Sequence, residues 1–383
     1  MLEISLAYNG FYRRFVFENR VILDKKRAKS DIEPNRSSNH YSTRLTCNCG
    51  LMKTIAIPAL QTEAPMTAIG ALEILNESCS PWCQTDQSHL GSAPFDVQVV
   101  SERGEPVKFT NGIVLHPSHS ISEVKPDIIV VPALGQELDT TLKRNQVYVD
   151  WVRQSYNRGS HVASMCTGAF VLGAAGLLDG KRATTHWFFA DEFKRRFPRV
   201  DLQQQQMIVD EGDIVTCGAL TAYLNLIIYL VEKYFGHDIA LRTAKMYLID
   251  MDRPSQLPFQ IYRFPVTSGD SSIARIQEFI GKHFKEDLAT DDVAKRAGMS
   301  VRNFSRRFKS ATGESFANYI QKLRIETAKR LLESTECSAS ETMYQVGYND
   351  ERSFRRLFKH HSGLSPKQYR TKFKIRFQNI ASK

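Results

Sequence analysis

The sequence predicts an α/β domain followed by an all-α domain that contains two helix-turn-helix units. Short apolar runs alternate with amphipathic segments over residues 52–235, as in a parallel sheet that helices cover on both faces. Residues 291–373 contain one helical pattern twice, and from Phe304 onward the two copies match at an offset of fifty residues. We therefore expect four segments, which are a basic tail (1–51), an α/β domain (52–250), a linker (251–272) and a helical domain (273–375).

The α/β domain should be built on buried parallel strands. The run from Asp127 to Val131 is unbroken and apolar, as a central parallel strand requires. The expected strands are 53–57, 95–101, 126–132 and 160–165, with a hairpin at 207–216. The expected helices are 66–77, 146–157, 167–175, 187–196 and 220–234.

One junction in this domain raises the question of chemistry. A strand runs directly into a helix at Cys166, which is the layout of a nucleophile elbow at the carboxyl end of a sheet. A helix N-terminus also lowers the pKa of a thiol. His186 is either a second ligand contact or a hydrogen-bonded residue at a helix start. We take Cys166, Thr167, His186 and the Gly135 loop as the candidate lining of a ligand pocket.

Basic charge is concentrated at the two ends of the chain. Residues 270–383 contain 23 Lys and Arg against 13 Asp and Glu, and residues 1–51 contain 9 against 5. A polyanion-binding domain beside a near-neutral partner domain would show this distribution. Residues 1–51 have little periodicity, and they are either a disordered basic arm or the product of a start codon placed too early, with Met52 the true start.

The seven cysteines favour a reducing compartment, because they form no obvious disulfide framework and no signal peptide precedes them. The spacings Cys47–Cys49 and Cys79–Cys83 are not typical of zinc sites, and no suitable His pair follows them. No apolar run reaches membrane-spanning length. The sequence thus predicts a cytoplasmic protein without a metal ion, a cofactor or a membrane segment.

Each copy of the repeat has the caps and turns of a DNA-reading motif. In the first copy Thr290 can cap a short helix, Gly298 supplies a tight turn and Ser300 caps the next helix. In the second copy Asn349 or Asp350 can cap the corresponding helix. Pairs of Phe residues four apart should face inward, at Phe304 and Phe308 and at Phe354 and Phe358.

The outward faces of these helices carry the candidate DNA contacts. A helix over 316–332 would hold the two reading heads at a fixed separation, and heads on one face of B-DNA lie about 34 Å apart. Arg and Asn are the side chains best shaped for guanine and adenine edges. The candidates for base contacts are Arg302, Asn303, Arg306, Arg352 and Arg355, those for phosphate contacts are Lys309, Lys359 and Arg370, and Arg307 and Arg356 also face outward. The alternative, a solvated basic bundle, explains neither the repeat nor the capped turns.

Two stretches of the second copy follow a known signature. They are Val346-Gly-Tyr-Asn-Asp-Glu-Arg-Ser-Phe-Arg-Arg-Leu-Phe-Lys359 and Ser362-Gly-Leu-Ser-Pro-Lys-Gln-Tyr-Arg370. They closely resemble the C-terminal signature of the AraC family of DNA-binding domains, and the resemblance extends over residues 273–373. It implies a domain that binds double-stranded promoter DNA.

Residues 52–235, with the Cys166 elbow and His186, resemble the flavodoxin-like fold of DJ-1/PfpI proteins, which is similar to class I glutamine amidotransferases. Two departures argue against catalysis. PfpI-type hydrolases carry a histidine where this chain has Thr167, and DJ-1-like members carry an acidic residue near the position of Thr67. Without a general base or an orienting carboxylate a Cys–His pair is a poor catalyst, so we predict no catalytic residues.

Together the two domains resemble the GlxA-like branch of AraC-family regulators. The resemblance implies a cytoplasmic homodimer whose first domain senses a small-molecule effector and whose second domain binds promoter DNA, most often as an activator that contacts RNA polymerase. It implies effectors from amino acid or quaternary amine catabolism. The main alternative, a cysteine-dependent hydrolase or glyoxalase-like enzyme fused to a DNA-binding module, predicts turnover that disappears in Cys166→Ser. A nucleoid-like architectural binder predicts no ligand effect and little sequence preference.

Overall fold

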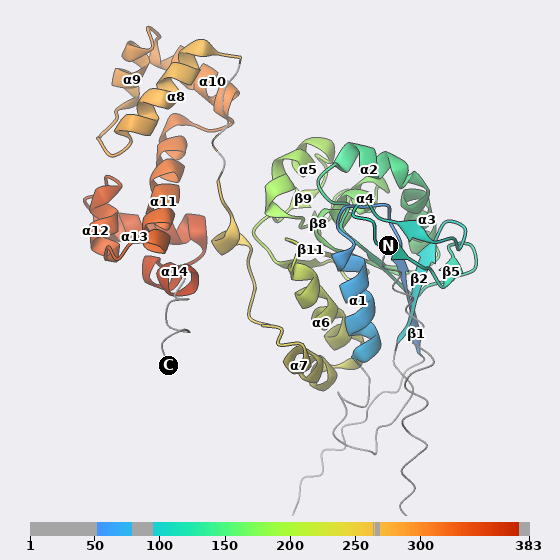
Figure 1. Cartoon of the computed structure of the whole chain (residues 1–383). Helices are drawn as coiled ribbons and strands as arrows, with labels where there is room; N and C mark the ends of the chain where they lie inside the picture. Colours follow the sequence, from blue (N-terminus) through green and yellow to red (C-terminus); the bar gives the residue numbers. More distant parts are fainter. Residues whose placement is uncertain (1–51, 79–94, 263, 265–268, 375–383) are drawn as a thin grey trace, which may run out of the picture. The chain divides into compact units, whose positions relative to one another are not determined.

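The computed structural model describes residues 52–78, 95–262, 264 and 269–374 (Figure 1). The strands are β1 (Lys53–Pro58), β2 (Phe95–Ser101), β3 (Val107–Lys108), β4 (Val114–Leu115), β5 (His119–Ser120), β6 (Ile128–Val131), β7 (His161–Ser164), β8 (Arg182–Ala183), β9 (Asp201–Leu202), β10 (Ile208–Asp210) and β11 (Ile214–Cys217). The α-helices of the first domain are α1 (Met66–Glu77), α2 (Leu138–Arg144), α3 (Gln146–Asn157), α4 (Ala169–Ala174), α5 (Ala190–Arg196), α6 (Ala222–Phe235) and α7 (His237–Met246). Those of the second domain are α8 (Ser271–His283), α9 (Thr290–Arg296), α10 (Val301–Thr312), α11 (Phe316–Ser334), α12 (Ala339–Gln345), α13 (Glu351–Ser362) and α14 (Pro366–Phe373). Short 3-10 helices are η2 (Cys166–Gly168), η3 (Trp187–Phe189) and η4 (Leu257–Phe259).

Seven strands of the first domain form one sheet in the order β10-β11-β7-β6-β1-β2-β5. The strands β2, β1, β6, β7 and β11 pair in parallel, and this order is that of a flavodoxin-like doubly wound sheet. β10 pairs antiparallel with β11, which confirms the hairpin predicted at 207–216. The strand order reverses between β1 and β6, and in such sheets ligands bind outside the carboxyl ends of the strands at that point.

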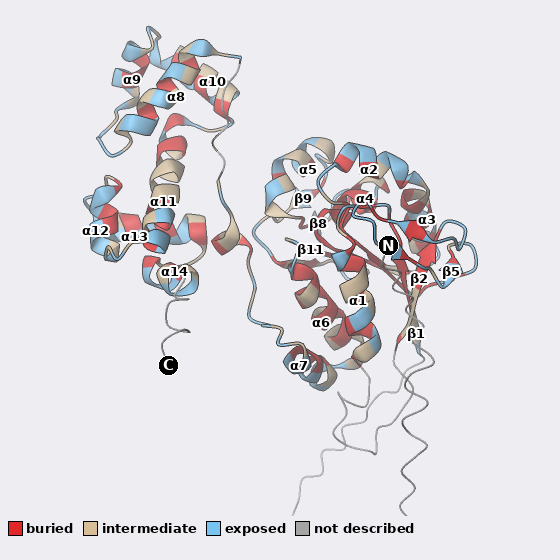
Figure 2. Cartoon of the chain, viewed as in Figure 1, coloured by how far each residue is buried: buried red, intermediate tan, exposed pale blue. Residues whose placement is uncertain are grey.

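Helices cover both faces of this sheet (Figure 1). α1, α6 and α7 enclose one core with one face of the sheet, and α3, α4 and α5 enclose a second core with the other face. The central strand β6 supplies both cores, since Ile128 and Val130 belong to the first and Ile129 and Val131 to the second. All four side chains are buried, and this strand has no polar positions. Figure 2 shows in red that buried residues gather in the sheet between the helices.

Most predicted elements of the first domain are confirmed, and α1, α3 and β2 have the predicted bounds. The helices expected at 167–175 and 187–196 differ, because each begins with a 3-10 turn, η2 or η3, before the α-helix starts. The sequence prediction omits α2 and α7. α7 follows α6 with only Gly236 between them, and the φ of +88° at this glycine allows the sharp change of direction.

The helical domain contains two small cores that share α11. The first lies between α8, α9, α10 and the first half of α11, around Phe304 and Phe308. The second lies between the rest of α11 and α12, α13 and α14, around Phe354 and Phe358. The four phenylalanine side chains are at most 1 % exposed, as the paired spacing predicts. α11 is the predicted helix that joins the two units.

Part of the segment predicted as a linker is hydrogen-bonded to the first domain. Ser255 forms an antiparallel bridge with Gln206. Gln256 is 1 % exposed, and its side-chain amide donates to the carbonyl oxygens of Thr185 and Gln206 at 3.0 Å each. The same amide accepts a hydrogen bond from the N–H of Ala219 at 2.9 Å. The stretch around Gln256 is thus an ordered part of the α/β domain.

Several sequence predictions concern residues outside the described ones. They are the basic tail (1–51), the cysteines Cys47, Cys49, Cys79 and Cys83, and residues 265–268 of the linker. In the described parts of the chain, no helix has both the length and the apolar composition needed to cross a membrane. The same parts contain no group of three or more His, Cys, Asp or Glu side chains arranged to hold a metal ion.

Candidate nucleic-acid interface and ligand site

α10 and α13, the second helices of the two helix-turn-helix units, begin and end in the same way. The Ser300 hydroxyl accepts a hydrogen bond from the N–H three residues along its helix at 3.4 Å, and the Asp350 carboxylate does the same at 2.8 Å. Both helices end at a glycine in the left-handed region, Gly313 with φ +77° and Gly363 with φ +72°. The predicted cap at Ser300 is therefore confirmed, and of the two candidates Asn349 and Asp350 the cap is Asp350.

The first helices of the two units begin differently. Thr290 is the first residue of α9, and the N-cap is Ala289, which has no side-chain acceptor. The prediction that Thr290 caps this helix is therefore wrong by one position. α12 has a full capping box instead, in which Ser338 and Glu341 each satisfy the backbone N–H of the other.

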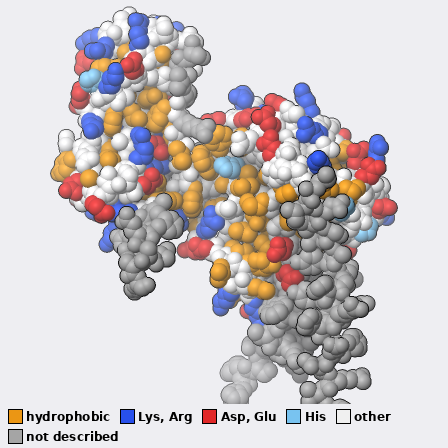
Figure 3. Space-filling model, in the orientation of Figure 1, with side chains coloured by type: hydrophobic (Ala, Val, Ile, Leu, Met, Phe, Trp, Pro, Cys, Tyr) orange, Lys and Arg blue, Asp and Glu red, His pale blue; other side chains and the backbone are white. Residues whose placement is uncertain are grey.

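The exposed faces of α10 and α13 carry most of the predicted DNA contacts. The exposed side chains are Arg302, Arg306 and Lys309 on α10, and Arg352, Arg355, Arg356 and Lys359 on α13. Arg306 donates to Oδ1 of the half-buried Asn303 at 3.1 Å, and Arg355 forms an ion pair with Glu351. Figure 3 shows Lys and Arg side chains scattered among acidic ones on the face of the helical domain that it draws, so each cation has to be judged by its own neighbours.

Arg307 is engaged within the first unit. Its guanidinium donates to the two carboxylate oxygens of Asp270 at 2.9 and 2.7 Å. Asp270 also caps α8, and the hydrogen bonds from Arg307 hold the pKa of this carboxyl below its usual value. This bidentate contact occupies the donors with which an arginine reads a guanine. In this structure Arg307 ties α10 to the start of α8.

Arg370 is similarly engaged in the second unit. It is half-buried, and its guanidinium donates to the carbonyl oxygens of Glu336 and Cys337. These carbonyls lie between the end of α11 and the start of α12, where no helix satisfies them. Arg370 therefore ties α14 to this connection.

Cys166 lies at the carboxyl end of β7 in a strained conformation. Its φ is +54°, a value that non-glycine residues rarely adopt and that nucleophile elbows require. A Cβ atom on Gly168 would lie 2.6 Å from the carbonyl oxygen of Pro132, so only glycine fits this corner. The Cys166 side chain is 5 % exposed, so the corner is formed without presenting the thiol to solvent.

Two hydrogen bonds hold the corner that contains the residues predicted to line a ligand pocket. The Thr167 hydroxyl donates to the carbonyl oxygen of Gly135 at 3.4 Å. The Thr185 hydroxyl donates to the carbonyl oxygen of Cys166 at 2.9 Å, and His186 follows in the chain. The structure thus brings Gly135, Thr167, Cys166 and His186 to one corner at the carboxyl edge of the sheet.

Burial keeps both Cys166 and His186 uncharged near neutral pH. It raises the pKa of the Cys166 thiol to about 11, although hydrogen bonds with Thr167 oppose the rise. It lowers the pKa of His186 to about 4. Nδ1 of His186 accepts a hydrogen bond from the N–H of Phe188 at 3.1 Å, so His186 is a hydrogen-bonded residue at the start of η3. Nucleophilic cysteines need a lowered pKa, which this corner does not supply.

Thr67, the predicted counterpart of the acidic residue in DJ-1-like proteins, has a structural hydroxyl. Thr67 Oγ1 accepts from the N–H of Ala133 at 3.1 Å and donates to the carbonyl oxygen of Ala64 at 3.2 Å. The nearby Glu63 carboxylate accepts from the N–H of Gln136 at 3.4 Å. Both side chains hold the loops after β1 and β6.

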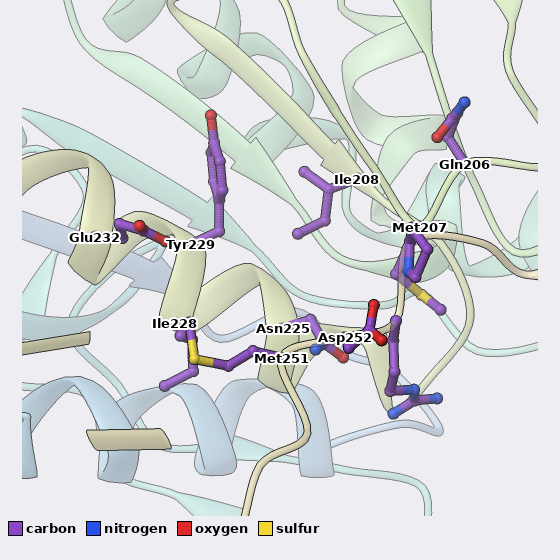
Figure 4. A pocket seen from close by; sticks show the side chains of 11 residues that line it. Gln206, Met207, Ile208, Asn225, Ile228, Tyr229, Glu232, Met251 and Asp252 are labelled. Atoms are coloured by element: carbon purple, nitrogen blue, oxygen red, sulfur yellow. The ribbon is translucent and has the colours of Figure 1, made fainter. Parts of the chain in front are cut away.

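Described residues line two pockets considered as ligand sites in the α/β domain. The smaller, of about 150 Å³, lies at the ends of β1 and β6, and it adjoins the Gly135 loop through Glu63. Its lining consists of Gln61, Thr62, Glu63, Thr110, Glu137, Thr140, Thr141 and Arg144. The larger, of about 320 Å³, lies between β10, α6 and residues 251–254 (Figure 4). Neither lining includes Cys166 or His186.

Comparison with known proteins agrees with this division of the chain. Residues 70–233 match the DJ-1/PfpI family, and residues 293–372 match a helix-turn-helix domain. The HTH-type transcriptional regulator CdhR of Pseudomonas aeruginosa is 27 % identical over 276 residues, which cover 71 % of this chain and 80 % of CdhR. The HTH-type transcriptional regulator GlxA of Rhizobium meliloti is 28 % identical over 211 residues, or 54 % of this chain and 64 % of GlxA.

The chain belongs to the AraC family of transcriptional regulators. Within this family it has the domain order of the GlxA-like branch, and it is a DNA-binding regulator. The α/β domain of this AraC-family regulator is also similar to an enzyme. Isonitrile hydratase of Pseudomonas putida is 33 % identical over 174 residues, which cover 44 % of this chain and 72 % of the hydratase.

Sequence reasoning missed three polar residues that matter in this AraC-family regulator. Asp270 and Gln256 lie in the segment predicted as a linker, where composition gives no sign of their partners. Asn225 is a polar residue in the first turn of the apolar helix α6 and lines the larger pocket. A buried polar residue on an apolar helix face is a signal that could have identified Asn225 from the sequence.

Proposed function

We propose that this AraC-family regulator activates catabolic genes in response to a small molecule, by binding promoter DNA through α10 and α13. The observation that carries the proposal is the matched pair of helices, each with a capped start, a buried Phe pair and a face of exposed cations. Because α11 belongs to both cores, the two helices are held by one continuous element, as the reading of two successive major-groove segments requires.

The exposed residues divide into two roles in this proposal. Arg302, Arg306, Arg352 and Arg355 choose bases, because their guanidinium groups can donate to the edge of a guanine. Lys309, Lys359 and Arg356 bind phosphates, which supplies affinity without sequence preference. Asn303 positions Arg306 through the 3.1 Å hydrogen bond. We assign no DNA contact to Arg307 and Arg370, because two guanidinium nitrogens of each donate to acceptors within the domain.

The α/β domain acts as the sensor in this proposal. An effector of the amino acid or quaternary amine class would favour one arrangement of a homodimer, in which both helical domains reach their half-sites. It can shift that balance only by its differential affinity for the two arrangements. The corner of Cys166, Thr167, His186 and Gly135, with the 150 Å³ pocket beside it, is one candidate location. Promoter DNA as the target also implies a cytoplasmic site of action and contact with RNA polymerase.

Catalysis at Cys166 is the second candidate function, and the similarity to isonitrile hydratase is the observation that favours it. We propose that this chain has no such activity, because burial opposes both the thiolate and the imidazolium that the chemistry needs. Incubation of the full chain with isonitriles and aldehydes, followed by product analysis, tests this point. Turnover that disappears in Cys166→Ser would restore the enzyme hypothesis.

In vitro selection of random double-stranded DNA by the full chain tests the regulator function. We expect enriched sequences with two short preferred blocks about ten base pairs apart, one for each recognition helix. The affinity for them should fall steeply with salt, because phosphate contacts release counterions. The double variant Arg302→Ala, Arg352→Ala, which leaves the phosphate-binding lysines in place, is the matched control and should lose the preference at one or two base pairs in each block. Binding by the unmodified chain without any enriched block would contradict the proposal and favour an architectural binder.

A further inference from the structure

The larger pocket of the α/β domain is a second possible ligand site, away from the Cys166 corner. Its volume of about 320 Å³ is at the lower end of the range for small-molecule sites, so a metabolite of a few heavy atoms would fit. Figure 4 shows lining side chains from three places in the chain, which are the start of β10, the helix α6 and the segment of residues 251–254 that follows it.

Asn225 supplies the first sign of what this pocket binds. The residue is 8 % exposed, and its Nδ2 donates to the carbonyl oxygen of Asp250 at 2.7 Å. This contact fixes the orientation of the amide, since only the NH₂ group can donate to a carbonyl. Its Oδ1 lacks a hydrogen-bond donor within the described part of the chain. An unpaired buried acceptor destabilises the folded protein, so a ligand that brings a donor is favoured.

The charges around the pocket supply the second sign. Glu232 and Asp252 both line it, and the lining contains one cationic side chain, Arg253. The Arg253 guanidinium lies over the Phe259 ring at 5.4 Å and donates to the Thr221 hydroxyl at 3.4 Å. The Glu232 carboxylate accepts a hydrogen bond from Nδ1 of His237, which leaves Asp252 as the carboxylate on the outer wall. A cationic ligand would balance this acidic excess.

The apolar part of the lining suits the stem of such a ligand. Met207, Ile208 and Ile228 contribute aliphatic and thioether surface. Tyr229 contributes its ring, because its hydroxyl is used in a hydrogen bond to Asp210. An aromatic ring beside a desolvated cation adds a favourable electrostatic interaction.

We propose that this pocket binds a small protonated amine with at least one N–H group, which donates to Oδ1 of Asn225 while its charge faces Asp252. The N–H requirement separates primary, secondary and tertiary ammonium ions from quaternary ones, which have no donor for the unpaired acceptor. The role of this amine as an effector rests on the proposed function, which allows effectors of the amino acid class and of the quaternary amine class. The binding itself does not depend on that function.

The position of the site suggests how occupancy would act. Residues 251–254 form one wall, and the chain then continues through Gln256 toward the helical domain. Pro254 accepts a hydrogen bond from the N–H of Met207 at 3.1 Å, so this wall is already attached at its far end. Its near end is held at Asp250, whose carbonyl oxygen accepts from Asn225. An amine held between Asn225 and Asp252 would add a contact to the Asp252 side chain, and it would thus stabilise the bound state of the segment.

Two methylation series test the proposal on the full chain, with thermal shift and calorimetry as readouts. The first is ethanolamine, its N-methyl and N,N-dimethyl derivatives, and choline. The second is glycine, sarcosine, dimethylglycine and betaine. We expect binding in at least one series, with a loss of about tenfold or more in affinity at the quaternary member, as the loss of a charge-assisted hydrogen bond gives. No binding in either series overturns the proposal, and so does equal binding of the quaternary member.

Variants locate the site. Asp252→Asn removes the charge at an exposed position that should not disturb folding, and we expect it to weaken amine binding about tenfold or more. Asn225→Leu removes the acceptor and should weaken binding similarly. Asp201→Asn makes the same chemical change as Asp252→Asn at an exposed position outside the pocket, and it should bind as the unmodified chain does. Unchanged binding in Asp252→Asn, or loss of binding in Cys166→Ser, would overturn the location.

The DNA-binding role is measured separately, by fluorescence anisotropy with a selected DNA fragment in the presence and absence of the bound amine. Amine binding with unchanged DNA affinity would keep the site and contradict its regulatory role. Amine binding by a chain that selects no DNA sequence would keep the site and contradict the proposed function. A failure of the site and a failure of the regulator therefore give different results.

Discussion

At an offset of fifty residues, the first helix-turn-helix unit has Arg307 where the second has Leu357. Arg307 reaches the Asp270 carboxylate at the start of α8, whereas Leu357 packs against the second core. The two units thus have similar apolar cores but different polar contacts at their surfaces. A cation on a recognition helix can belong to the protein rather than to the DNA, and only its neighbours reveal which.

In a second matched pair the apolar residue lies in the first unit and the arginine in the second. Ile320 is buried in the first core, and the second unit has Arg370 at the matching place. Arg370 satisfies two carbonyl oxygens in the connection between α11 and α12. The matched tyrosines differ as well, since Tyr319 accepts from Gln277 at 3.3 Å and Tyr369 donates to Glu333 at 2.7 Å. Each unit therefore has its own polar ties around a shared apolar plan.

The largest expected effect comes from that shared plan. Phe308→Ala and Phe358→Ala each remove a fully buried ring, and each should destabilise its own unit by about 3–5 kcal/mol. Hydrogen exchange measured by mass spectrometry on the full chain separates peptides of α10 from peptides of α13. If either substitution left its own unit fully protected, the equivalence of the two cores would be disproved.

Substitutions of the turn glycines, Gly298 and Gly347, also test the comparison of the two units, and we expect a somewhat smaller loss of stability from them. Gly298 has φ +67° and open space around it, so Gly298→Ala should cost about 1–2 kcal/mol for the left-handed backbone alone. Gly347 has φ +84°, and an added methyl group would overlap the backbone carbonyl of Lys285. Gly347→Ala should cost a further 1–3 kcal/mol or so for this overlap. Equal losses of protection in the two turns would show that the Lys285 contact has no consequence.

Measurements of DNA affinity should distinguish the exposed cations from those that are bound to acceptors within the protein. Arg306→Ala should cost roughly 1–3 kcal/mol on the best site and relax the preference at one or two base pairs. Arg307→Leu copies the second unit and should leave the preferred sequence unchanged, because Arg307 is bound to Asp270. Dissociation constants on a panel of single-base variants, at one fixed salt concentration, give both answers. Equal weakening of Arg306→Ala on every sequence would make Arg306 a phosphate contact instead.

Local signals in the sequence were enough for the recognition helices and for much of the sheet. The cap at Asp350, the buried Phe pairs and the bounds of α1 depend on residues a few positions apart, which spacing reveals. The tie from Arg307 to Asp270 spans 37 residues, and the hydrogen bond from Gln256 to Thr185 spans 71. Such contacts depend on how distant segments meet in the fold, and periodicity carries no information about that. The amine pocket belongs to this second class, because its walls come from three separate segments.

The smallest expected effect is the loss of stability of the first unit at low pH, where Asp270 becomes protonated. Arg307 lowers the pKa of the Asp270 carboxyl below its usual value of 3.8, so the ionised form stabilises the folded unit. This contribution is present above that pH and is lost as the pH falls through the lowered pKa. Asp270→Asn should therefore reduce the protection of α8 and α10 at neutral pH, and the difference from the unmodified chain should shrink in acid.

Hydrogen exchange over a pH series, corrected for the intrinsic exchange rate, measures this difference, and the α13 peptides serve as the internal control. Asp350 also has a lowered pKa, through its contacts with Ser353, but it titrates in both proteins and cancels from the comparison. A difference in α10 that persisted unchanged well below pH 3.8 would mean that Asp270 acts through its shape as a cap rather than through its charge. A difference that appeared equally in α13 would mean that the two units do not fold independently, and the contrast between Arg307 and Leu357 would then be a property of the whole helical domain.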